Sequence, residues 1–255
     1  EPEYQVKDKS LEGLGADLNR LAAGEPVQYV IGFADFCGLR FKVTPDVLIP
    51  RPETELLCRE AIKIGSRMQR MRKAYGKSAK PVRVLDLCTG SGCIAWTVAL
   101  NIPGAEVTGV DISEKAVAVA SSQDFAAKIK ESGASAPKFV VADVLAGNQT
   151  FTEGDYDLIL SNPPYIMESQ KSQMRVNVLN YEPSTALFVE DSDPLVFYRS
   201  IAVLSRTCLS AEGKGLTEIN ELLGPETQKV FSEAGFQKID LVKDFYDKNR
   251  FVFYS

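Results

Sequence analysis

Histidine is absent from this sequence of 255 residues. Without an imidazole group, the chain can form neither a Ser-His-Asp nor a Cys-His catalytic site, and it has no HExxH motif and no imidazole-based metal centre. Cysteine is sparse as well, with five scattered residues and no CxxC pair. The sequence therefore predicts no disulfide framework and no bound metal, as is typical of a protein from a reducing cytoplasm.

Long hydrophobic runs are also missing, since no apolar stretch approaches the roughly 20 residues that a membrane helix needs. The opening sequence EPEYQVKDKS does not resemble a signal peptide. We therefore expect a soluble cytoplasmic protein without a membrane partner. The 34 acidic and 29 basic residues give a net charge of −5, which disfavours direct binding of nucleic acid without excluding a local basic groove.

The N-terminal part is predicted to contain a helix, a hairpin and an extended segment. Leucines at helical spacing indicate an amphipathic helix over residues 10–23. Residues 29–43 carry aromatic and β-branched side chains around a turn at 35–38, which favours a β-hairpin. The prolines of LIPRPETE, residues 48–55, hold the chain extended before a helix that we expect over residues 54–69.

From residue 82 onward, short apolar runs alternate with helical patterns. This alternation predicts an α/β fold in which helices cover both faces of a parallel sheet. Ligands of such sheets bind beyond the carboxyl ends of the strands, so the residues that follow each strand are candidates for a site. The predicted strands are 82–87, 106–113, 138–143, 156–165, 216–219, 239–242 and 251–254, and the predicted helices are 93–100, 114–131, 194–209 and 225–234.

The first of these strands runs into the sequence DLCTGSG, which begins at Asp86 and ends at Gly92. Glycine lets the backbone approach a ligand closely, and the N-terminus of the following helix offers N–H groups to a polar group. Alone, the turn is as consistent with a structural role as with ligand binding, because it lacks the full GxGxxG spacing of a dinucleotide site.

Acidic residues at the ends of the next two strands strengthen the prediction of a nucleoside site. Asp111 lies where nucleoside-binding α/β folds place the carboxylate that accepts both ribose hydroxyls. It could instead cap the next helix, but Ser113 is better placed for that role. Asp143 could bind an adenine amino group while Val144 packs on the ring, and a capping or turn role for Asp143 is the alternative.

The fourth strand leads directly into Asn162-Pro163-Pro164-Tyr165. A simple strand-ending turn is one interpretation, but the two prolines also fix a carboxamide, a carbonyl and an aromatic ring beside the expected nucleoside. The Asn162 side-chain oxygen and the Pro163 carbonyl can accept the two N–H bonds of a planar amide or aromatic amine and aim its nitrogen at an electrophilic methyl group. The proton need not be removed before the attack, so the absence of histidine is no obstacle.

Together, DLCTGSG, GVDIS and SNPPY resemble the motifs of class I S-adenosylmethionine-dependent methyltransferases that modify a planar NH2 group. With LIPRPETE, GEPVQYVIGFADFCGLRF and NYEPSTALF, the sequence from about Gly24 onward resembles the HemK/PrmC family of protein-glutamine methyltransferases. The resemblance implies a Rossmann-like α/β fold with a seven-stranded, mostly parallel sheet and helices on both faces. It further implies a remnant of an N-terminal helical domain (residues 1–28), a β-hairpin linker (29–50) and a methyltransferase domain (51–255).

The resemblance also implies a reaction and the residues that serve it. The substrate would be the glutamine of the Gly-Gly-Gln motif of peptide chain release factors, methylated on its side-chain amide nitrogen, with S-adenosylmethionine as the methyl donor and S-adenosylhomocysteine as the product. Residues 51–54 match a family segment beside the cofactor, although Glu53 could serve only as a charge at a helix N-terminus. Cys88 replaces a usual glycine, so we expect a backbone there that avoids positive φ. The implied catalytic residues are Asn162, Pro163 and Tyr165; with Pro164 they form the glutamine pocket, and the cofactor would contact Asp86, Cys88, Thr89, Gly90, Ser91, Gly92, Asp111, Asp143, Val144 and Asn162.

Two other functions compete with this one. An adenine-amino methyltransferase acting on DNA or RNA could use the same NPPY pocket, but the acidic composition and the LIPRPETE segment favour a protein substrate. The other is a nucleoside-binding module or a nicotinamide dehydrogenase: the dehydrogenase would give no role to Asn162 or Tyr165, and a binding module predicts that Asn162→Ala leaves the function unchanged.

Overall fold

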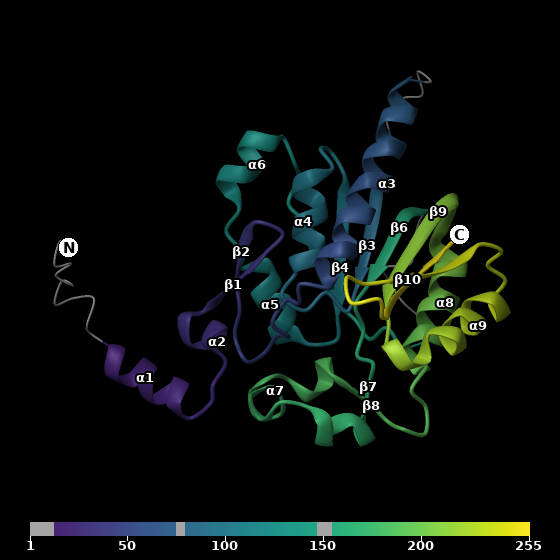
Figure 1. Cartoon of the computed structure of the whole chain (residues 1–255). Helices are drawn as coiled ribbons and strands as arrows, with labels where there is room; N and C mark the ends of the chain where they lie inside the picture. The colour runs from purple at the N-terminus through teal and green to yellow at the C-terminus, as the bar shows by residue number, and fades with distance from the viewer. Residues whose placement is uncertain (1–12, 75–79, 147–154) are drawn as a thin grey trace.

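The computed structural model describes residues 13–74, 80–146 and 155–255. Its centre is a seven-stranded sheet in the order β10-β11-β9-β6-β3-β4-β5 (Figure 1). Five adjacent strands, from β9 to β5, run parallel, whereas β11 is antiparallel to both of its neighbours. The strands are β3 (Arg83–Leu87), β4 (Glu106–Asp111), β5 (Lys138–Val141), β6 (Tyr156–Ser161), β9 (Leu209–Glu218), β10 (Ile239–Lys243) and β11 (Asn249–Tyr254).

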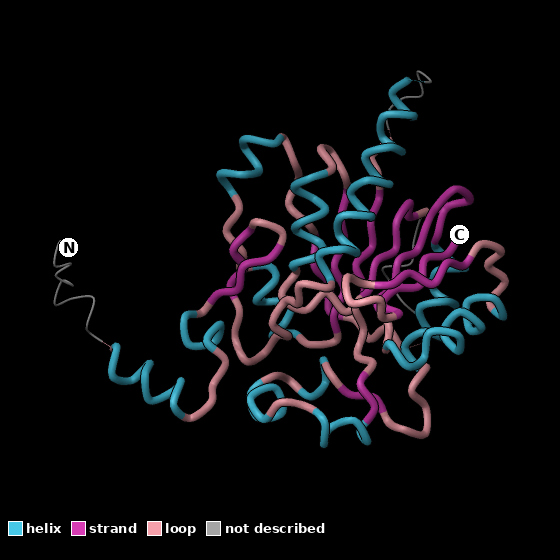
Figure 2. The backbone as a smooth tube through the Cα atoms, viewed as in Figure 1, coloured by secondary structure: helices cyan, strands magenta, loops and turns pink. Residues whose placement is uncertain are grey.

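Helices lie on both faces of this sheet because its central strands are apolar on both sides. Successive side chains of a strand point to opposite faces, and Val84 and Leu85 accordingly belong to two different core clusters. The predicted mostly parallel α/β sheet is therefore confirmed, and Figure 2 shows helices around its strands. One face packs against α3 (Thr54–Ala74), α4 (Cys93–Asn101) and α6 (Ala126–Ser132), with α5 (Glu114–Ser121) beside α4, and the other face packs against α8 (Val196–Cys208) and α9 (Gly224–Glu233).

The single helix predicted over residues 114–131 is wrong, because α5 and α6 are separate helices. Between them, the Gln123 side chain bonds the backbone N–H and C=O of Lys42 at 2.9 and 3.0 Å, and the Phe125 ring packs 5.2 Å from that of Trp96. These tertiary contacts outweigh the local helical pattern. The strand predicted over residues 216–219 is likewise only the end of the longer β9.

The segment before the sheet contains α1 (Leu14–Ala22), α2 (Val27–Ile31), β1 (Phe33–Phe36) and β2 (Leu39–Lys42). The predicted hairpin is confirmed in β1 and β2, but residues 29–31 belong to α2 and not to a strand. Of the helix predicted over residues 10–23, positions 10–12 lie outside the described residues. Apolar side chains of this segment pack in one cluster with Ala116 and Val119 of α5 and so join it to the body of the protein. Within the cluster, the Tyr29 hydroxyl donates to the Val47 carbonyl at 2.6 Å.

After β6 the chain forms a small layer beyond the edge of the sheet (Figure 1). This layer contains β7 (Ile166–Met167), α7 (Val176–Tyr181) and β8 (Phe188–Val189), together with 3-10 helices at Glu168–Gln173 and Ser184–Ala186. A further 3-10 helix, Glu221–Leu223, follows β9. Within the described ranges, none of the helices is both long and apolar enough to span a membrane.

Candidate active site

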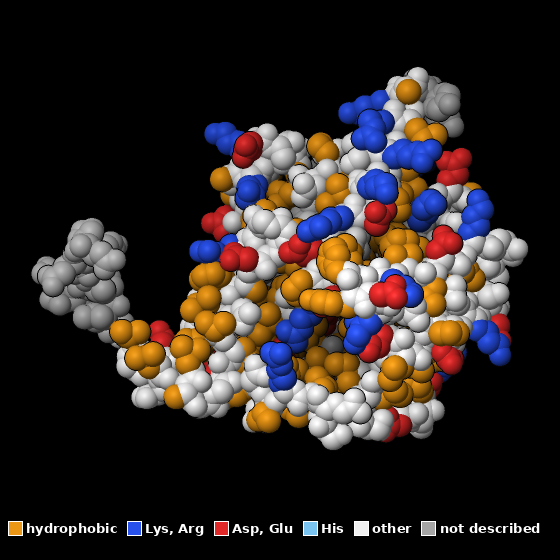
Figure 3. Space-filling view, in the orientation of Figure 1, with side chains coloured by type: hydrophobic (Ala, Val, Ile, Leu, Met, Phe, Trp, Pro, Cys, Tyr) orange, Lys and Arg blue, Asp and Glu red, His pale blue; other side chains and the backbone are white. Residues whose placement is uncertain are grey.

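A cavity of about 360 Å³ opens at the carboxyl ends of the parallel strands, where the topology predicts a ligand site. Figure 3 shows this face hollowed, with hydrophobic side chains inside the hollow. Loops after β3, β4, β5 and β6 line it together with residues 46–54 and 183–188. Most of the site residues proposed from the sequence line this cavity: Cys88, Thr89, Gly90, Ser91, Asp111, Asp143, Val144, Asn162 and Pro164. The proposed residues that do not line it are Asp86, Gly92, Pro163 and Tyr165.

The loop after β3 turns sharply because it contains three residues with positive φ. These are Cys88 (61°), Gly90 (54°) and Gly92 (78°). A methyl group added at Gly92 would lie 3.0 Å from the Ala120 side chain and 3.1 Å from the Phe139 ring, so Gly92 allows close packing behind the loop, while Gly90 faces open space.

The expectation that Cys88 avoids positive φ is wrong. A left-handed conformation costs a non-glycine residue about 1–2 kcal/mol. The Cys88 side chain packs against the core cluster that contains Leu87 and Val110, and this burial offsets the strain. The loop therefore keeps its glycine-like shape with a cysteine in it.

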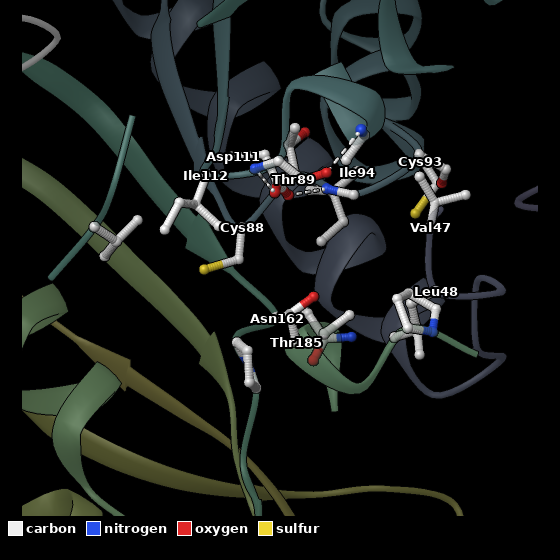
Figure 4. A pocket seen from close by; sticks show the side chains of 18 of the residues that line it. Val47, Leu48, Cys88, Thr89, Cys93, Ile94, Asp111, Ile112, Asn162 and Thr185 are labelled. Atoms are coloured by element: carbon white, nitrogen blue, oxygen red, sulfur yellow. Dashed lines mark hydrogen bonds between the residues drawn. The ribbon is translucent and has the colours of Figure 1, made fainter. Parts of the chain in front are cut away.

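Asp111 ends β4 and holds the glycine loop against the next helix. Its Oδ2 accepts the Gly90 N–H at 2.8 Å, and its Oδ1 accepts the Ser113 N–H at 3.0 Å. Burial raises the pKa of its carboxyl group, whereas these amide hydrogen bonds lower it. Ser113 caps α5 by accepting the Ala116 N–H, as predicted. The carboxylate borders the cavity and retains acceptor capacity there, because each oxygen can accept more than one hydrogen bond (Figure 4).

Asp86 lies behind the loop and is completely buried. Its Oδ2 accepts the Thr89 hydroxyl at 2.5 Å and the Ala95 N–H at 3.2 Å, so it ties the loop to the start of α4. Among the described residues, its Oδ1 has no hydrogen-bond partner. Burial raises the pKa of this carboxyl group from 3.8 to about 7.

We expect this shift to make the protein less stable as the pH rises. The folded state prefers protonated Asp86, so the stabilisation is fully present below about pH 4 and is lost as the pH passes through about 7. The asparagine of Asp86→Asn cannot titrate. Between about pH 5 and pH 8, we therefore expect the free energy of unfolding to fall by about 3 kcal/mol more in the wild type than in this variant. Urea denaturation at both pH values measures the difference. Equal pH dependence of the two proteins would show that this carboxyl group is not the source.

Asp143 and Val144 follow β5 at the next position along the edge. The Asp143 carboxylate accepts the Leu145 N–H at 2.8 Å and lines the cavity. The Val144 side chain is buried, and its carbonyl accepts the Ser200 hydroxyl from α8. Asp143 thus does form a local turn, the alternative that its sequence position left open, and it still faces the cavity.

Asn162 lies on the opposite side of the cavity from Thr89 and Asp111 (Figure 4). Its side-chain NH2 donates to the Thr54 hydroxyl oxygen at 3.1 Å, and the Thr54 hydroxyl donates to Glu218 at 2.7 Å. The Tyr165 hydroxyl donates to the other Glu218 oxygen at 2.9 Å. One buried carboxylate therefore connects both ends of the NPPY sequence.

The wall formed by residues 46–54 is joined to the segment after α7 by Glu182. This side chain is only 1% exposed and accepts the Arg51 guanidinium at 2.6 Å and the Ile49 N–H at 3.1 Å. Arg51 and Thr54 line the cavity, but Pro52 and Glu53 do not. Sequence reasoning assigned no role to Glu182 or Glu218, although Glu182 belongs to the NYEPSTALF segment and Glu218 to the strand predicted over residues 216–219.

No group of three or more Cys, Asp or Glu side chains could hold a metal ion in residues 13–74, 80–146 and 155–255. The polar groups around the cavity are instead carboxylates, hydroxyls, backbone amides, the Arg51 guanidinium and the Asn162 carboxamide. Such groups bind a nucleoside and orient a second polar group beside it.

The comparisons with known proteins agree with this geometry. A family profile described as Methyltransferase small domain matches residues 55–187. The release factor glutamine methyltransferase of Bacteroides thetaiotaomicron is 38% identical over 248 residues, which cover 96% of this chain and 80% of that protein. The release factor glutamine methyltransferase of Flavobacterium psychrophilum is 39% identical over 235 residues, which cover 92% of this chain and 77% of that protein.

Solved structures resemble this chain in fold. The hMettl16 catalytic domain in complex with MAT2A 3′UTR hairpin 6 matches with a TM-score of 0.61 and 14% identity, over 86% of this chain and 76% of that one. A methyltransferase from Pyrococcus furiosus matches with a TM-score of 0.54 and 15% identity, over 95% and 98% of the two chains. The fold is that of class I methyltransferases, and the much higher identity to the sequence relatives shows that this chain belongs to the HemK/PrmC family of S-adenosylmethionine-dependent release factor glutamine methyltransferases.

Proposed function

We propose that this enzyme methylates the side-chain amide nitrogen of the glutamine in the Gly-Gly-Gln motif of peptide chain release factors. The observation that carries the proposal is the orientation of Asn162, whose NH2 group is held by Thr54 at 3.1 Å. The Asn162 carbonyl oxygen is the end of the amide left to accept a hydrogen bond from a substrate, at the border of the cavity.

The residues around the cavity fit S-adenosylmethionine. Gly90 has open space at its Cα, so a ligand can approach the backbone, and the Asp111 carboxylate next to it can accept ribose hydroxyls. We assign the adenine to Asp143 and Val144, which line the same cavity. When bound, the cofactor supplies an electrophilic methyl group on a positively charged sulfur.

The chain's own part in the reaction is to hold and aim the substrate amide. A glutamine amide nitrogen is a weak nucleophile because its lone pair is delocalised. The Asn162 oxygen accepts one of its N–H bonds at the border of the cavity, and we assign the other to the carbonyl of Pro163, the next residue, which lies outside the cavity lining. The two acceptors fix the amide plane and stabilise the positive charge that develops on nitrogen. The proton leaves to solvent after the nitrogen–carbon bond has formed, so no histidine is required. Tyr165 supports this pocket from behind through its hydrogen bond to Glu218.

A protein substrate is favoured over nucleic acid by two observations. The relatives at 38% and 39% identity are named release factor glutamine methyltransferases, whereas the RNA-bound structure resembles this chain at only 14% identity, which concerns the fold alone. The net charge of −5 also disfavours binding to the phosphates of a nucleic acid.

The test is incubation of the protein and S-adenosylmethionine with a purified bacterial release factor, followed by mass spectrometry of tryptic peptides. We expect one added methyl group on the peptide that contains Gly-Gly-Gln and none when its glutamine is replaced by alanine. Parallel reactions contain single-stranded and duplex DNA and RNA. Methylation of nucleic acid without methylation of the release factor would contradict the proposal.

A further inference from the structure

Glu218 is a buried carboxylate that enters the reaction described above as the hydrogen-bond partner of Tyr165. It is the last residue of β9, the strand next to β6, and β6 leads into Asn162. Only 1% of Glu218 is exposed. A buried charge is costly unless hydrogen bonds compensate it, and an apolar side chain would fill the same place without that cost. A carboxylate at this buried position therefore indicates a functional role.

The bonds of Glu218 form a chain with a fixed direction. An ionised carboxylate can only accept hydrogen bonds, so the Thr54 hydroxyl, 2.7 Å away, uses its single hydrogen toward Glu218. The Thr54 oxygen is then an acceptor for its other neighbour, the Asn162 side chain at 3.1 Å. Only the NH2 end of an amide can donate, and the carbonyl end of Asn162 is therefore the free one.

We propose that Glu218 is a positioning residue that acts through Thr54 to fix which end of the Asn162 carboxamide faces the substrate. This inference rests on the proposed function, because a substrate NH2 group needs the oxygen of Asn162 and would be repelled by its NH2. The two ends of an amide have nearly the same shape, so packing alone would not distinguish them; hydrogen-bond direction does.

A second branch of the same carboxylate holds the remainder of the NPPY loop. The Tyr165 hydroxyl donates to the other Glu218 oxygen at 2.9 Å, and the Tyr165 carbonyl accepts the Asn220 side-chain N–H at 2.9 Å. Burial raises the pKa of the Glu218 carboxyl group, whereas the two hydroxyl hydrogen bonds and the charge of Arg250 lower it. The Glu218 carboxylate is therefore held by hydrogen bonds connected to both ends of the NPPY loop, through Thr54 to Asn162 and directly to Tyr165.

Glu218→Gln is the sharpest test because it keeps the shape and removes the charge. The glutamine side chain has one acceptor oxygen and one NH2 donor, so it cannot accept at both positions where Thr54 and Tyr165 now donate. When the NH2 faces Thr54, the Thr54 hydroxyl turns toward Asn162, and Asn162 must present its oxygen to Thr54 and its NH2 to the cavity. We expect kcat for release factor methylation to fall about 30-fold, with KM and the dissociation constant for S-adenosylhomocysteine changed less than about threefold.

Thr54 provides an independent variant of the same connection. Thr54→Val keeps the shape but has no hydroxyl, so we expect a loss of kcat similar to that of Glu218→Gln. Thr54→Ser retains the hydroxyl and should restore most of the loss seen with valine. Thermal unfolding of each variant identifies any that is not folded.

A double-mutant cycle with Asn162→Ala tests whether Glu218 acts through Asn162. In that background, we expect Glu218→Gln to change single-turnover methylation by less than about twofold, because there is no amide left to orient. The Asn162 side-chain NH2 signals in 15N NMR spectra of the cofactor-free protein should also shift in Glu218→Gln. A full 30-fold loss in the Asn162→Ala background, or unshifted NH2 signals, would overturn the inference. If the wild type methylates no release factor, the proposed function fails, and the NMR measurement still tests the role of Glu218 separately.

Discussion

Replacing Asn162 with alanine is expected to lower kcat for glutamine methylation by about a thousandfold, on the scale of one lost preorganised polar contact in a catalytic site. The variant loses the oxygen that we propose as the acceptor of the substrate N–H. The loop after β3 and the Asp111 carboxylate, on the opposite side of the cavity, keep their hydrogen bonds. The dissociation constant for S-adenosylmethionine should therefore change less than about threefold. Single-turnover transfer of a tritiated methyl group measures the rate, and calorimetry measures the affinity.

Asn101→Ala is the matched control for this prediction. Asn101 lies at the end of α4 and bonds the Thr97 carbonyl within its own helix at 2.8 Å, away from the cavity. Like Asn162→Ala, this variant removes an asparagine side chain, and we expect it to methylate the glutamine at the wild-type rate. Parallel losses of rate and cofactor affinity in Asn162→Ala would contradict the positioning role of Asn162 and indicate collapse of the cavity.

The second large effect is expected for Asp111→Ala, whose dissociation constant for S-adenosylmethionine should rise about 100-fold. Hydrogen bonds to a charged group contribute about 1.5–3 kcal/mol each, and this variant would lose the ones that we propose Asp111 makes to ribose. It also leaves the Gly90 and Ser113 N–H groups without their acceptor, so the loop loses its shape. Isothermal titration calorimetry measures the change in affinity.

Asp244→Ala separates the loss of ribose contacts from general destabilisation. The Asp244 carboxylate also accepts two backbone amides, those of Tyr246 and Lys248 at 2.8 and 3.2 Å, and it bonds Arg250. It lies in the loop between β10 and β11 and does not line the cavity. We expect lower stability with unchanged cofactor affinity in this variant. An Asp111→Ala protein that binds the cofactor within about threefold of the wild type would refute the ribose contact.

The parts of the site that the sequence predicts are those encoded by short local patterns. An apolar run followed by glycines predicted the loop after β3, and a strand that ends in Asn-Pro-Pro-Tyr predicted the position of Asn162. Both patterns work because strand ends in a parallel sheet share one edge. The same reasoning places Asp111 and Asp143 at the cavity.

Contacts between distant segments could not be predicted in the same way. Thr54 and Glu218 are separated by 164 positions, and nothing in either neighbourhood indicates the other. The division between α5 and α6 depends on Gln123, whose partner Lys42 lies 81 positions away. Even Cys88 shows this limit, since its positive φ is tolerated only because tertiary packing supports it.

The Glu182 contacts also carry a consequence for the order of folding. They join Ile49 and Arg51 to a residue 133 and 131 positions away, and the entropy of closing so long a loop must be overcome before these contacts stabilise the chain. Contacts of long range form late in folding because adjacent strands and helices can assemble first. We therefore expect the parallel sheet to assemble before residues 46–54 close over its edge. In kinetic terms, S-adenosylmethionine would bind an almost native chain and slow unfolding without accelerating the first steps of folding.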